Sequence, residues 1–379
     1  MGERKYFLDW LRVLAFGGLI LFHCGMLYVS WPYNLKSPHL VPAIEPAMNA
    51  LGAFRLALLF FISGTASRFL IARLGAGRFA ADRVRRLLPA ILFGMFVVIP
   101  PQTYIELVAK GVWHGNYLTF WFTQYLPAKQ ALVRPLHKTM PTWDHLWFVV
   151  YLFVYTLLMA LGFAITRRAK RGGRHRIAVA LLLVAPAVWL AGANLLIRYV
   201  FPRTDALVGD WGEHAKWIGM FAIGAYCAGY DAFWETLRRR RRAFLLAALP
   251  LLIVMSVVND PWWNVFNGLY AWPMVCALVG YAAEYLDAPS AALSHLNEAV
   301  LPIYILHQPI LLYAAYYIFP LGLPRSDEAL AIALVTAAGC FLIYEAIIRP
   351  FGPLRFLFGL KPNPQSFPSV APSALPPNG

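Results

Sequence analysis

Charged residues are scarce in this chain of 379 residues. Asp, Glu, Lys and Arg together make up 13% of it, whereas a soluble domain typically has about 25%. Hydrophobic residues make up 60%, and apolar stretches of about 20 residues recur along the sequence, each able to cross roughly 30 Å of hydrocarbon as a helix. The shortage of charge therefore excludes a large soluble domain and predicts that lipid is the main solvent.

Cysteine is also scarce. The four cysteines all lie inside apolar stretches, so their spacing provides neither a disulfide framework nor a set of metal ligands. A cleavable secretory signal is excluded too, because the first apolar run is too long, contains Arg12 and lacks a small-residue cleavage site. We expect no metal site and interpret the first run as a retained helix.

The apolar stretches predict an all-α, polytopic membrane protein with about ten transmembrane helices. Charge, proline and glycine clusters mark the ends of the spans. The expected spans lie near 9–30, 49–72, 88–108, 146–165, 177–198, 216–234, 244–258, 265–286, 299–319 and 329–350.

Basic residues outnumber acidic ones, with a formal net charge of +15. They lie in short runs between the apolar spans, which indicates membrane topology rather than a nucleic-acid partner. The positive-inside rule places both termini and residues 73–87, 166–176 and 235–243 in the cytoplasm. Residues 109–145 are then outside, where we expect a partly folded or re-entrant segment.

We expect one membrane domain over residues 1–360. The remaining segment, 361–379, is rich in Pro and Ser and has no apolar period. Such a composition predicts a disordered cytoplasmic tail without a catalytic role.

The first span carries two ionisable residues, Arg12 and His23, that are candidates for a functional role. Arg12 and His23 are eleven residues apart, and eleven helical steps of about 100° return to within about 20° of the starting direction, so both side chains share one helix face. They lie roughly 16 Å apart along the axis. Arg12 either snorkels to the inner headgroups beside Asp9 or serves a substrate. His23 lies deep in the span, where an ionisable group is costly, and is either functional or a neutral histidine bonded to another helix.

Short motifs follow one another in a fixed order along these spans. They are Leu8–Arg12 with His23, Phe60–Gly64, Arg83–Pro89, His145–Phe148 and Leu301–Pro309. The spacing of an arginine, ten residues and a histidine resembles the signature of the acyltransferase 3 family of membrane O-acyltransferases, and the other motifs resemble that family in the same order. The resemblance covers residues about 4–360. The start of the chain and its ending around Glu345 and Phe358–Lys361 resemble the glucan biosynthesis protein C branch, which succinylates periplasmic glucans.

This resemblance implies an enzyme that transfers acyl groups other than aminoacyl groups. The donor would be cytoplasmic acyl-CoA, a co-substrate with an acetyl or succinyl group, and no cofactor would be bound permanently. The acceptor would be a hydroxyl of a periplasmic or cell-surface glycan, and the location the bacterial inner membrane. His23 fits the general base that takes the hydroxyl proton. Arg12 fits the donor phosphates, because its planar fork pairs with oxyanions.

Further residues match the family motifs, and each has a simpler alternative. Arg83, Arg85 and Arg86 would bind the donor, or they only follow the positive-inside rule. Four residues are assigned supporting roles: Asp9, Tyr304, His307 and Glu345. His307 is alternatively a satisfied core histidine, and Glu345 is alternatively a structural partner of Arg349 or Arg12.

Most tryptophans lie at the outer ends of the expected spans, and flat aromatic faces can stack on sugar rings. On the acceptor side we therefore place His145, Trp143 and Trp147. An interfacial aromatic belt explains the tryptophans equally well.

A transporter or flippase of an envelope precursor is the main alternative, because charges inside spans also mark substrate pathways. The sequence lacks the paired short, Gly/Pro-broken segments that transporter repeats produce. A polyprenyl-linked glycosyltransferase would need an outer acidic motif, for which only weak candidates exist in Asp210, Glu213 and Asp260.

Overall fold

The computed structural model describes residues 5–128, 140–168, 178–204 and 206–362, and all regular structure in these ranges is helical. The first half contains α1 (Tyr6–Met26), a 3₁₀ turn (Pro42–Ile44), α2 (Glu45–Leu74), α3 (Ala76–Phe93), a π-helical turn (Gly94–Val98), α4 (Ile99–Ala109), α5 (Tyr117–Phe120), a second π-helical turn (Trp121–Tyr125), a 3₁₀ turn (Asp144–Leu146) and α7 (Trp147–Arg168). The second half contains α8 (Val179–Tyr199), α9 (Trp211–Cys227), α10 (Asp231–Val257), α11 (Trp262–Tyr285), α12 (Ala291–Ile318), a 3₁₀ turn (Phe319–Leu321), α13 (Arg325–Ile343), a π-helical turn (Tyr344–Ile348) and α14 (Gly352–Leu357).

Eight helical segments of the described chain are long and apolar enough to cross a membrane. They contain α1, α2, α3 with α4, α7, α8, α11, α12 and α13. This confirms the prediction of an all-α, polytopic membrane protein. The two other expected spans fall on α9, which has 17 residues, and on α10, which carries the run Arg238–Arg242.

The expected span at 216–234 is wrong at its end. Helix α9 stops at Cys227, and α10 begins at Asp231, whose carboxylate suits the positive end of the helix dipole. The charged segments before two spans are helical as well, since α3 begins at Ala76 and α10 includes the arginine run. Arginine and alanine are good helix formers, so each helix continues beyond the apolar part that the sequence marks.

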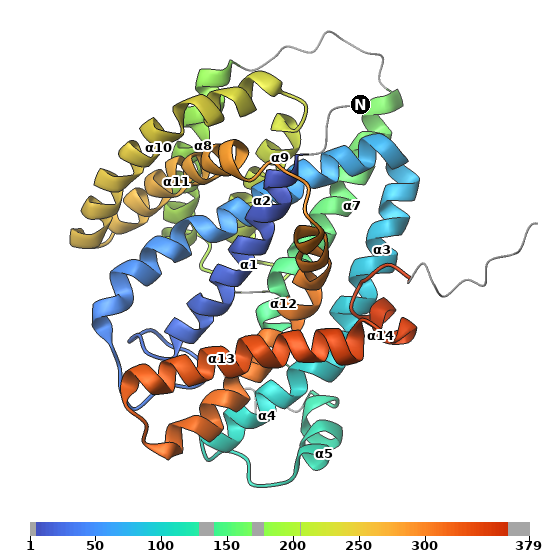
Figure 1. Cartoon of the computed structure of the whole chain (residues 1–379), viewed down its shortest axis with the longest axis vertical. Coiled ribbons are helices and arrows are strands. Elements are labelled where there is room, and N and C mark those ends of the chain that lie inside the picture. The colour runs from blue at the N-terminus through green and yellow to red at the C-terminus, as the bar shows by residue number, and fades with distance from the viewer. Residues whose placement is uncertain (1–4, 129–139, 169–177, 205, 363–379) are drawn as a thin grey trace, which may run out of the picture.

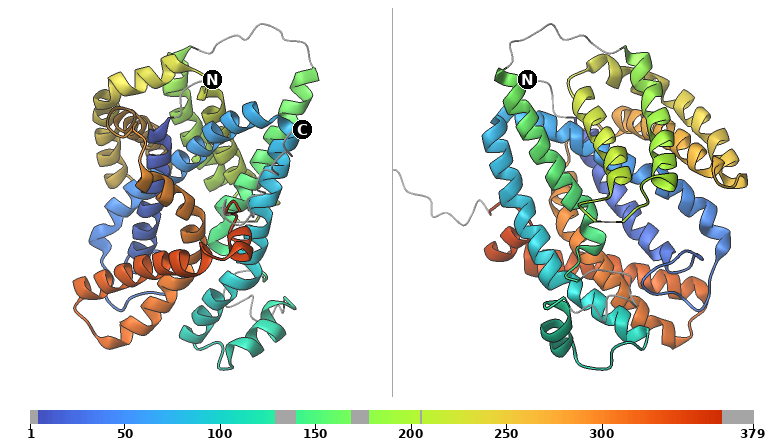
Figure 2. Two further views of the ribbon diagram at one scale, coloured as in Figure 1. Left: turned by 45° about the vertical axis from the view of Figure 1, so that its right-hand side comes forward. Right: turned by 180° about the vertical axis from the view of Figure 1, so that it is seen from behind.

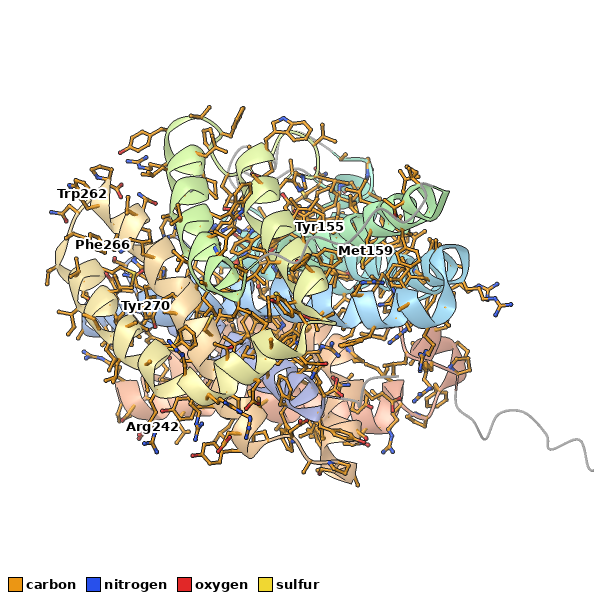
Figure 3. All side chains as sticks on the ribbon, turned by 90° about the horizontal axis from the view of Figure 1, so that it is seen from above. Tyr155, Met159, Arg242, Trp262, Phe266 and Tyr270 are labelled. Carbon is orange, nitrogen blue, oxygen red and sulfur yellow. The ribbon has the colours of Figure 1, made fainter. Side chains whose placement is uncertain are left out.

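Helix α1 lies in the middle of the bundle, where it packs against α2, α11, α12 and α13 (Figure 1). Seen from behind, α3 and α7 run side by side along another part of the bundle (Figure 2). Figure 3 shows the row Trp262, Phe266 and Tyr270 at four-residue spacing on α11. The row runs from an exposed residue into the core, because Trp262 is 61% exposed and Tyr270 is buried. The two ionisable residues of α1 are therefore surrounded by protein as well as by lipid.

The motif Phe60–Gly64 has a packing explanation. A Cβ atom on Gly64 would lie 1.9 Å from the carbonyl oxygen of Phe221, and one on Gly224 would lie 2.0 Å from that of Phe61. The hydroxyl of Thr65 donates to the carbonyl oxygen of Gly224 at 2.9 Å. The two glycines thus let the backbones of α2 and α9 touch, as small residues do in membrane helix pairs.

The segment expected outside is partly folded in its described portion. Helix α5 and the π-helical turn Trp121–Tyr125 follow α4, and Phe120 and Tyr125 pack in a small cluster with Leu107 and Met140. The hydroxyl of Tyr125 donates to the carbonyl oxygen of Met95 at 2.8 Å. Residues 129–139 of this segment, and 363–379 of the expected tail, lie outside the described residues.

Candidate active site

His23 and His307 meet edge to edge where α1 packs against α12. Nδ1 of His23 lies 2.7 Å from Nε2 of His307, and the ring planes are parallel within 5°, with centroids 4.9 Å apart. Nδ1 of His307 lies 2.6 Å from the carbonyl oxygen of Tyr304. The three groups form one hydrogen-bonded chain from the backbone of α12 to the ring of His23.

The carbonyl oxygen of Tyr304 determines where the protons lie in this series of hydrogen bonds. A carbonyl oxygen can only accept a hydrogen bond, so Nδ1 of His307 carries a proton. His307 is fully buried, where an imidazolium charge is costly, so its ring is neutral and its Nε2 accepts. His23 then donates from Nδ1, which leaves a lone pair on its own Nε2. The chain therefore selects the tautomer of His23 that can act as a base at Nε2.

Exposure distinguishes the two histidines. His307 is 0% exposed, whereas His23 is only half-buried. A group that takes a proton from a substrate must be reachable, so His23 suits contact with the substrate and His307 suits holding its ring.

Two further contacts hold His145 against the same turn of α12. Its Nε2 donates to the carbonyl oxygen of Ile305 at 3.1 Å. Pro309 lies four residues beyond Ile305 and has no N–H, so it cannot supply the helical hydrogen bond that this carbonyl would otherwise accept. The hydroxyl of Tyr304 donates to the carbonyl oxygen of His145. Two hydrogen bonds from side chain to backbone thus join the 3₁₀ turn Asp144–Leu146 to α12. In the described chain, no group of three His, Cys, Asp or Glu residues is arranged to hold a metal.

A polar network that the sequence analysis missed lies beside the histidines. The Gln308 amide donates to Asp144 Oδ1 at 3.2 Å and to Asn34 Oδ1 at 3.4 Å. Asn34 donates to Glu106 Oε2 at 2.6 Å, and Lys110 donates to the other oxygen of that carboxylate at 2.6 Å. Glu106 and Lys110 are an i,i+4 pair at the end of α4. Asn34, Asp144 and Gln308 come from three other parts of the chain, so no local spacing could have grouped them with this pair.

Arg55 of α2 was also missed as a site residue. It is 5% exposed, and its guanidinium carbon lies 3.9 Å from the ring centroid of Phe22, the neighbour of His23. A charge inside an apolar span was visible in the sequence, but the periodicity of α2 could not reveal which residues of other helices face it.

Arg12 lies at the opposite end of α1 with partners of its own. Its Nη1 donates to Asn297 Oδ1 at 3.1 Å and lies 3.6 Å from Asp9 Oδ1. The Asn297 amide also donates to Asp9, at 3.3 Å. Asn297 and His307 both belong to α12, so α12 pairs with α1 at both positions and runs parallel to it.

Two arginines of the Arg83–Arg86 cluster have protein partners. Arg83 pairs with its neighbour Asp82. Arg86 donates from Nε to the carbonyl oxygen of Gly359 at 3.0 Å, and Gly359 has a φ of +70°, which favours glycine. Arg86 is also within electrostatic range of Arg12, whereas Arg85 is exposed. The cluster therefore anchors the end of the membrane domain and adds positive charge near Arg12.

Glu345 pairs with Arg349, as their spacing predicts, at 2.8 Å. It also contacts His295 of α12. Arg12, the other residue considered as its partner, contacts Asp9 and Asn297. These contacts agree with the structural alternative for Glu345.

Trp143 and Trp147 lie near His145, at the start of α7. Both pack against the main core, and Arg203 lies 5.1 Å from the ring centroid of Trp147. Their role toward an acceptor stays a prediction.

The acidic residues considered for a glycosyltransferase are engaged by the protein. Asp210 accepts from Tyr151 at 2.6 Å, and Asp260 pairs with Arg198 at 3.1 Å. Glu213 accepts from the indole of Trp217. The three carboxylates therefore belong to separate local contacts.

The fold is that of a polytopic membrane protein, and a hydrogen-bonded pair of histidines lies inside its helical bundle. The chain belongs to the acyltransferase 3 family, because the family model described as an acyltransferase domain matches residues 5–345. It is an acyltransferase, and the predicted family is confirmed. The roles of individual residues stay predictions.

Curated relatives match over almost the whole chain. The chain is similar to Glucans biosynthesis protein C of Escherichia coli strain SMS-3-5 (24% identity) and strain K12 (23% identity), with 95% of each chain covered. No solved structure matches the chain.

Proposed function

We propose that this enzyme transfers an acetyl or succinyl group from cytoplasmic acyl-CoA to a hydroxyl of an extracytoplasmic glucan. It does so in the bacterial inner membrane, with both termini in the cytoplasm. Acyl-CoA is a co-substrate that leaves as free coenzyme A, and no cofactor is bound permanently.

One observation carries the catalytic part of the proposal. The chain from the Tyr304 carbonyl through His307 leaves Nε2 of His23 unprotonated. In the proposed step, Nε2 takes the proton of the acceptor hydroxyl while the hydroxyl oxygen attacks the thioester carbonyl carbon. The C–S bond then breaks, and the imidazolium returns the proton to the departing thiolate.

The donor side rests on charge and distance. Arg12 lies roughly 16 Å from His23 along α1, with Arg83, Arg85 and Arg86 as further cations on the same side. Guanidinium groups pair well with phosphate oxygens. An acyl-CoA bound with its phosphates near Arg12 directs its thioester toward His23.

The acceptor is proposed from the relatives and from the aromatic residues. The matched Escherichia coli proteins are named for glucan biosynthesis, and Trp143 and Trp147 lie beside His145 near the histidine pair. Aromatic faces favour the apolar faces of sugar rings.

The test uses the full-length enzyme, purified and reconstituted in vesicles of known orientation. Acetyl-CoA or succinyl-CoA is supplied on the cytoplasmic face, and a glucan is supplied on the other face. We expect ester-linked acyl groups on the glucan by mass spectrometry, together with release of free coenzyme A. Transport of glucan without ester formation would instead support the flippase alternative and overturn the proposal, as would absence of both products.

A further inference from the structure

We propose that Arg55 stabilises the negative charge that develops on the thioester carbonyl oxygen during acyl transfer. The inference rests on the proposed function and assigns a further catalytic residue to the same site.

Among the described residues, Arg55 is a buried charge that no carboxylate neutralises. Its side chain is 5% exposed, and a guanidinium stays charged under all ordinary conditions. Nε and Nη1 are buried and have no hydrogen-bond partner among the residues that the structure describes. A buried charge that is neither paired nor hydrogen-bonded costs several kcal/mol. Such a group inside a membrane bundle calls for a functional partner.

The surroundings of Arg55 place it at the reacting centre. Its guanidinium carbon lies 3.9 Å from the ring centroid of Phe22, one residue before the proposed base. It is also within electrostatic range of His23, His307 and Tyr304. The aromatic ring and neutral imidazoles beside it provide no formal negative charge, and within the described chain Arg55 makes no ion pair with a carboxylate.

The reaction supplies the missing negative charge. When the hydroxyl oxygen bonds to the carbonyl carbon, the electron pair of the C=O double bond moves to the carbonyl oxygen. The resulting oxyanion exists until the C–S bond breaks and the double bond returns. A preorganised hydrogen-bond donor in a site shielded from water stabilises this oxyanion most strongly. Arg55 is such a donor, because burial and the contact with the ring of Phe22 hold its guanidinium in the site before the substrate arrives.

The other arginines near α1 differ from Arg55 in this respect. Arg12 pairs with Asp9 and donates a hydrogen bond to Asn297, and Arg86 donates to the carbonyl oxygen of Gly359. Their positions suit binding of phosphates in the ground state. Arg55 suits a charge that appears only in the transition state, and binding of that kind raises kcat.

The test compares Arg55→Met with the wild-type enzyme, using both acetyl-CoA and succinyl-CoA. Loss of one oxyanion donor typically lowers kcat about 10²- to 10³-fold. We expect a fall in that range with both donors, while the Kd of each acyl-CoA stays within about threefold. Arg68→Met is the matched control, because Arg68 belongs to the same helix but contacts Phe163, roughly 20 Å along the axis from Arg55. Its kcat should stay near the wild-type value.

Arg55→Lys is a second variant that keeps the buried charge. It keeps the test decisive if the Arg55→Met enzyme does not fold. Its shorter, non-planar donor group should lower kcat about tenfold, since Lys does not reproduce the guanidinium fork. A folded Arg55→Met or Arg55→Lys enzyme with wild-type kcat would overturn the inference. A loss confined to succinyl-CoA would overturn it too, because Arg55 would then bind the carboxylate of that acyl group.

The proposed function can fail separately from this inference. If the wild-type enzyme forms no ester, the proposed function is wrong. If the wild-type enzyme is active and His23→Ala is not, retention of kcat in Arg55→Met refutes only the role of Arg55.

Discussion

The two ends of helix α1 hold ionisable groups in opposite ways. At the Arg12 end, the charge is met by the carboxylate of Asp9 and the amide of Asn297. At the His23 end, the guanidinium of Arg55 lies over an aromatic ring without an ion pair in the described chain, beside a neutral histidine pair. The first end is balanced at rest. At the second end, Asp144 contacts Gln308 and Glu106 contacts Lys110, so in the described chain neither carboxylate forms an ion pair with Arg55.

This difference supports the different tasks proposed for the two ends. A balanced cluster at the surface of the bundle can exchange partners with a ligand at small cost, which suits reversible donor binding. An unbalanced charge raises the energy of the resting state and is relieved in the transition state, which suits catalysis. Substitutions at the His23 end should therefore change kcat, and substitutions at the Arg12 end should change donor affinity.

The largest expected effect belongs to His23→Ala. Removal of a positioned base typically lowers the rate about 10²- to 10⁴-fold. We expect kcat to fall in this range while acyl-CoA still binds, measured by transfer to glucan and by equilibrium binding. His39→Ala in the exposed loop is the control. Turnover close to that of the wild type would remove His23 from the mechanism.

Substitution of His307 should have a smaller effect, because His307 acts through His23. His307→Leu removes the acceptor that selects the His23 tautomer, and we expect kcat to fall on the order of 10²-fold. His307→Gln keeps an oxygen that can accept from Nδ1 of His23 and should recover much of the loss. Equal kcat values for the two folded variants would contradict a positioning role, since a purely structural role predicts no special rescue by Gln.

Arg12→Lys should act on the donor instead. Lysine keeps the charge but loses the bidentate fork, so we expect acyl-CoA to bind about tenfold more weakly, or about 1.4 kcal/mol. The kcat at saturating donor should change little. Arg73→Lys, at an exposed position near the end of α2, is the control. A change in kcat without a change in Kd would erase the distinction between the two ends.

The smallest expected effect on catalysis belongs to Gly224→Ala, which lies at neither end. The added Cβ would meet the carbonyl oxygen of Phe61 at 2.0 Å, and overpacking typically costs about 1–3 kcal/mol. We expect a lower melting temperature with unchanged kcat per folded molecule. The control is Gly162→Ala on α7, where no atom outside the local helix backbone lies within 4 Å of the new Cβ. Equal melting temperatures would show that α2 and α9 can separate freely.

The helices were largely predictable from the sequence, because lipid imposes a minimum apolar length on each span. The errors occurred where that constraint ends. Helix α10 extends back through Arg238–Arg242, since arginine is compatible with a helix at a membrane surface. The end of α9 at Cys227 was missed although Gly229 and Asp231 follow it, because Phe233 and Trp234 extend the apolar pattern beyond them.

The site was predictable only in part. His23 and Arg12 share one helix, so helical geometry alone related them. The contact between His23 and His307 joins residues 284 positions apart, which periodicity within a helix cannot reveal. Arg55 was visible as a charge in an apolar span, but its proximity to Phe22 and the histidines depends on how α1 and α2 pack.

The parallel pairing of α1 with α12 fixes the distance between the two ends of the site. Arg12 contacts Asn297 at one end and His23 contacts His307 at the other. Neither helix can therefore slide along the other without breaking both contacts. In the proposed mechanism, the separation of roughly 16 Å between these two contacts sets a minimum reach for the donor. A compact acyl phosphate would be too short to reach from Arg12 to His23. A donor with a long arm between its phosphates and its thioester would reach both residues, so the spacing would favour it over short activated acids.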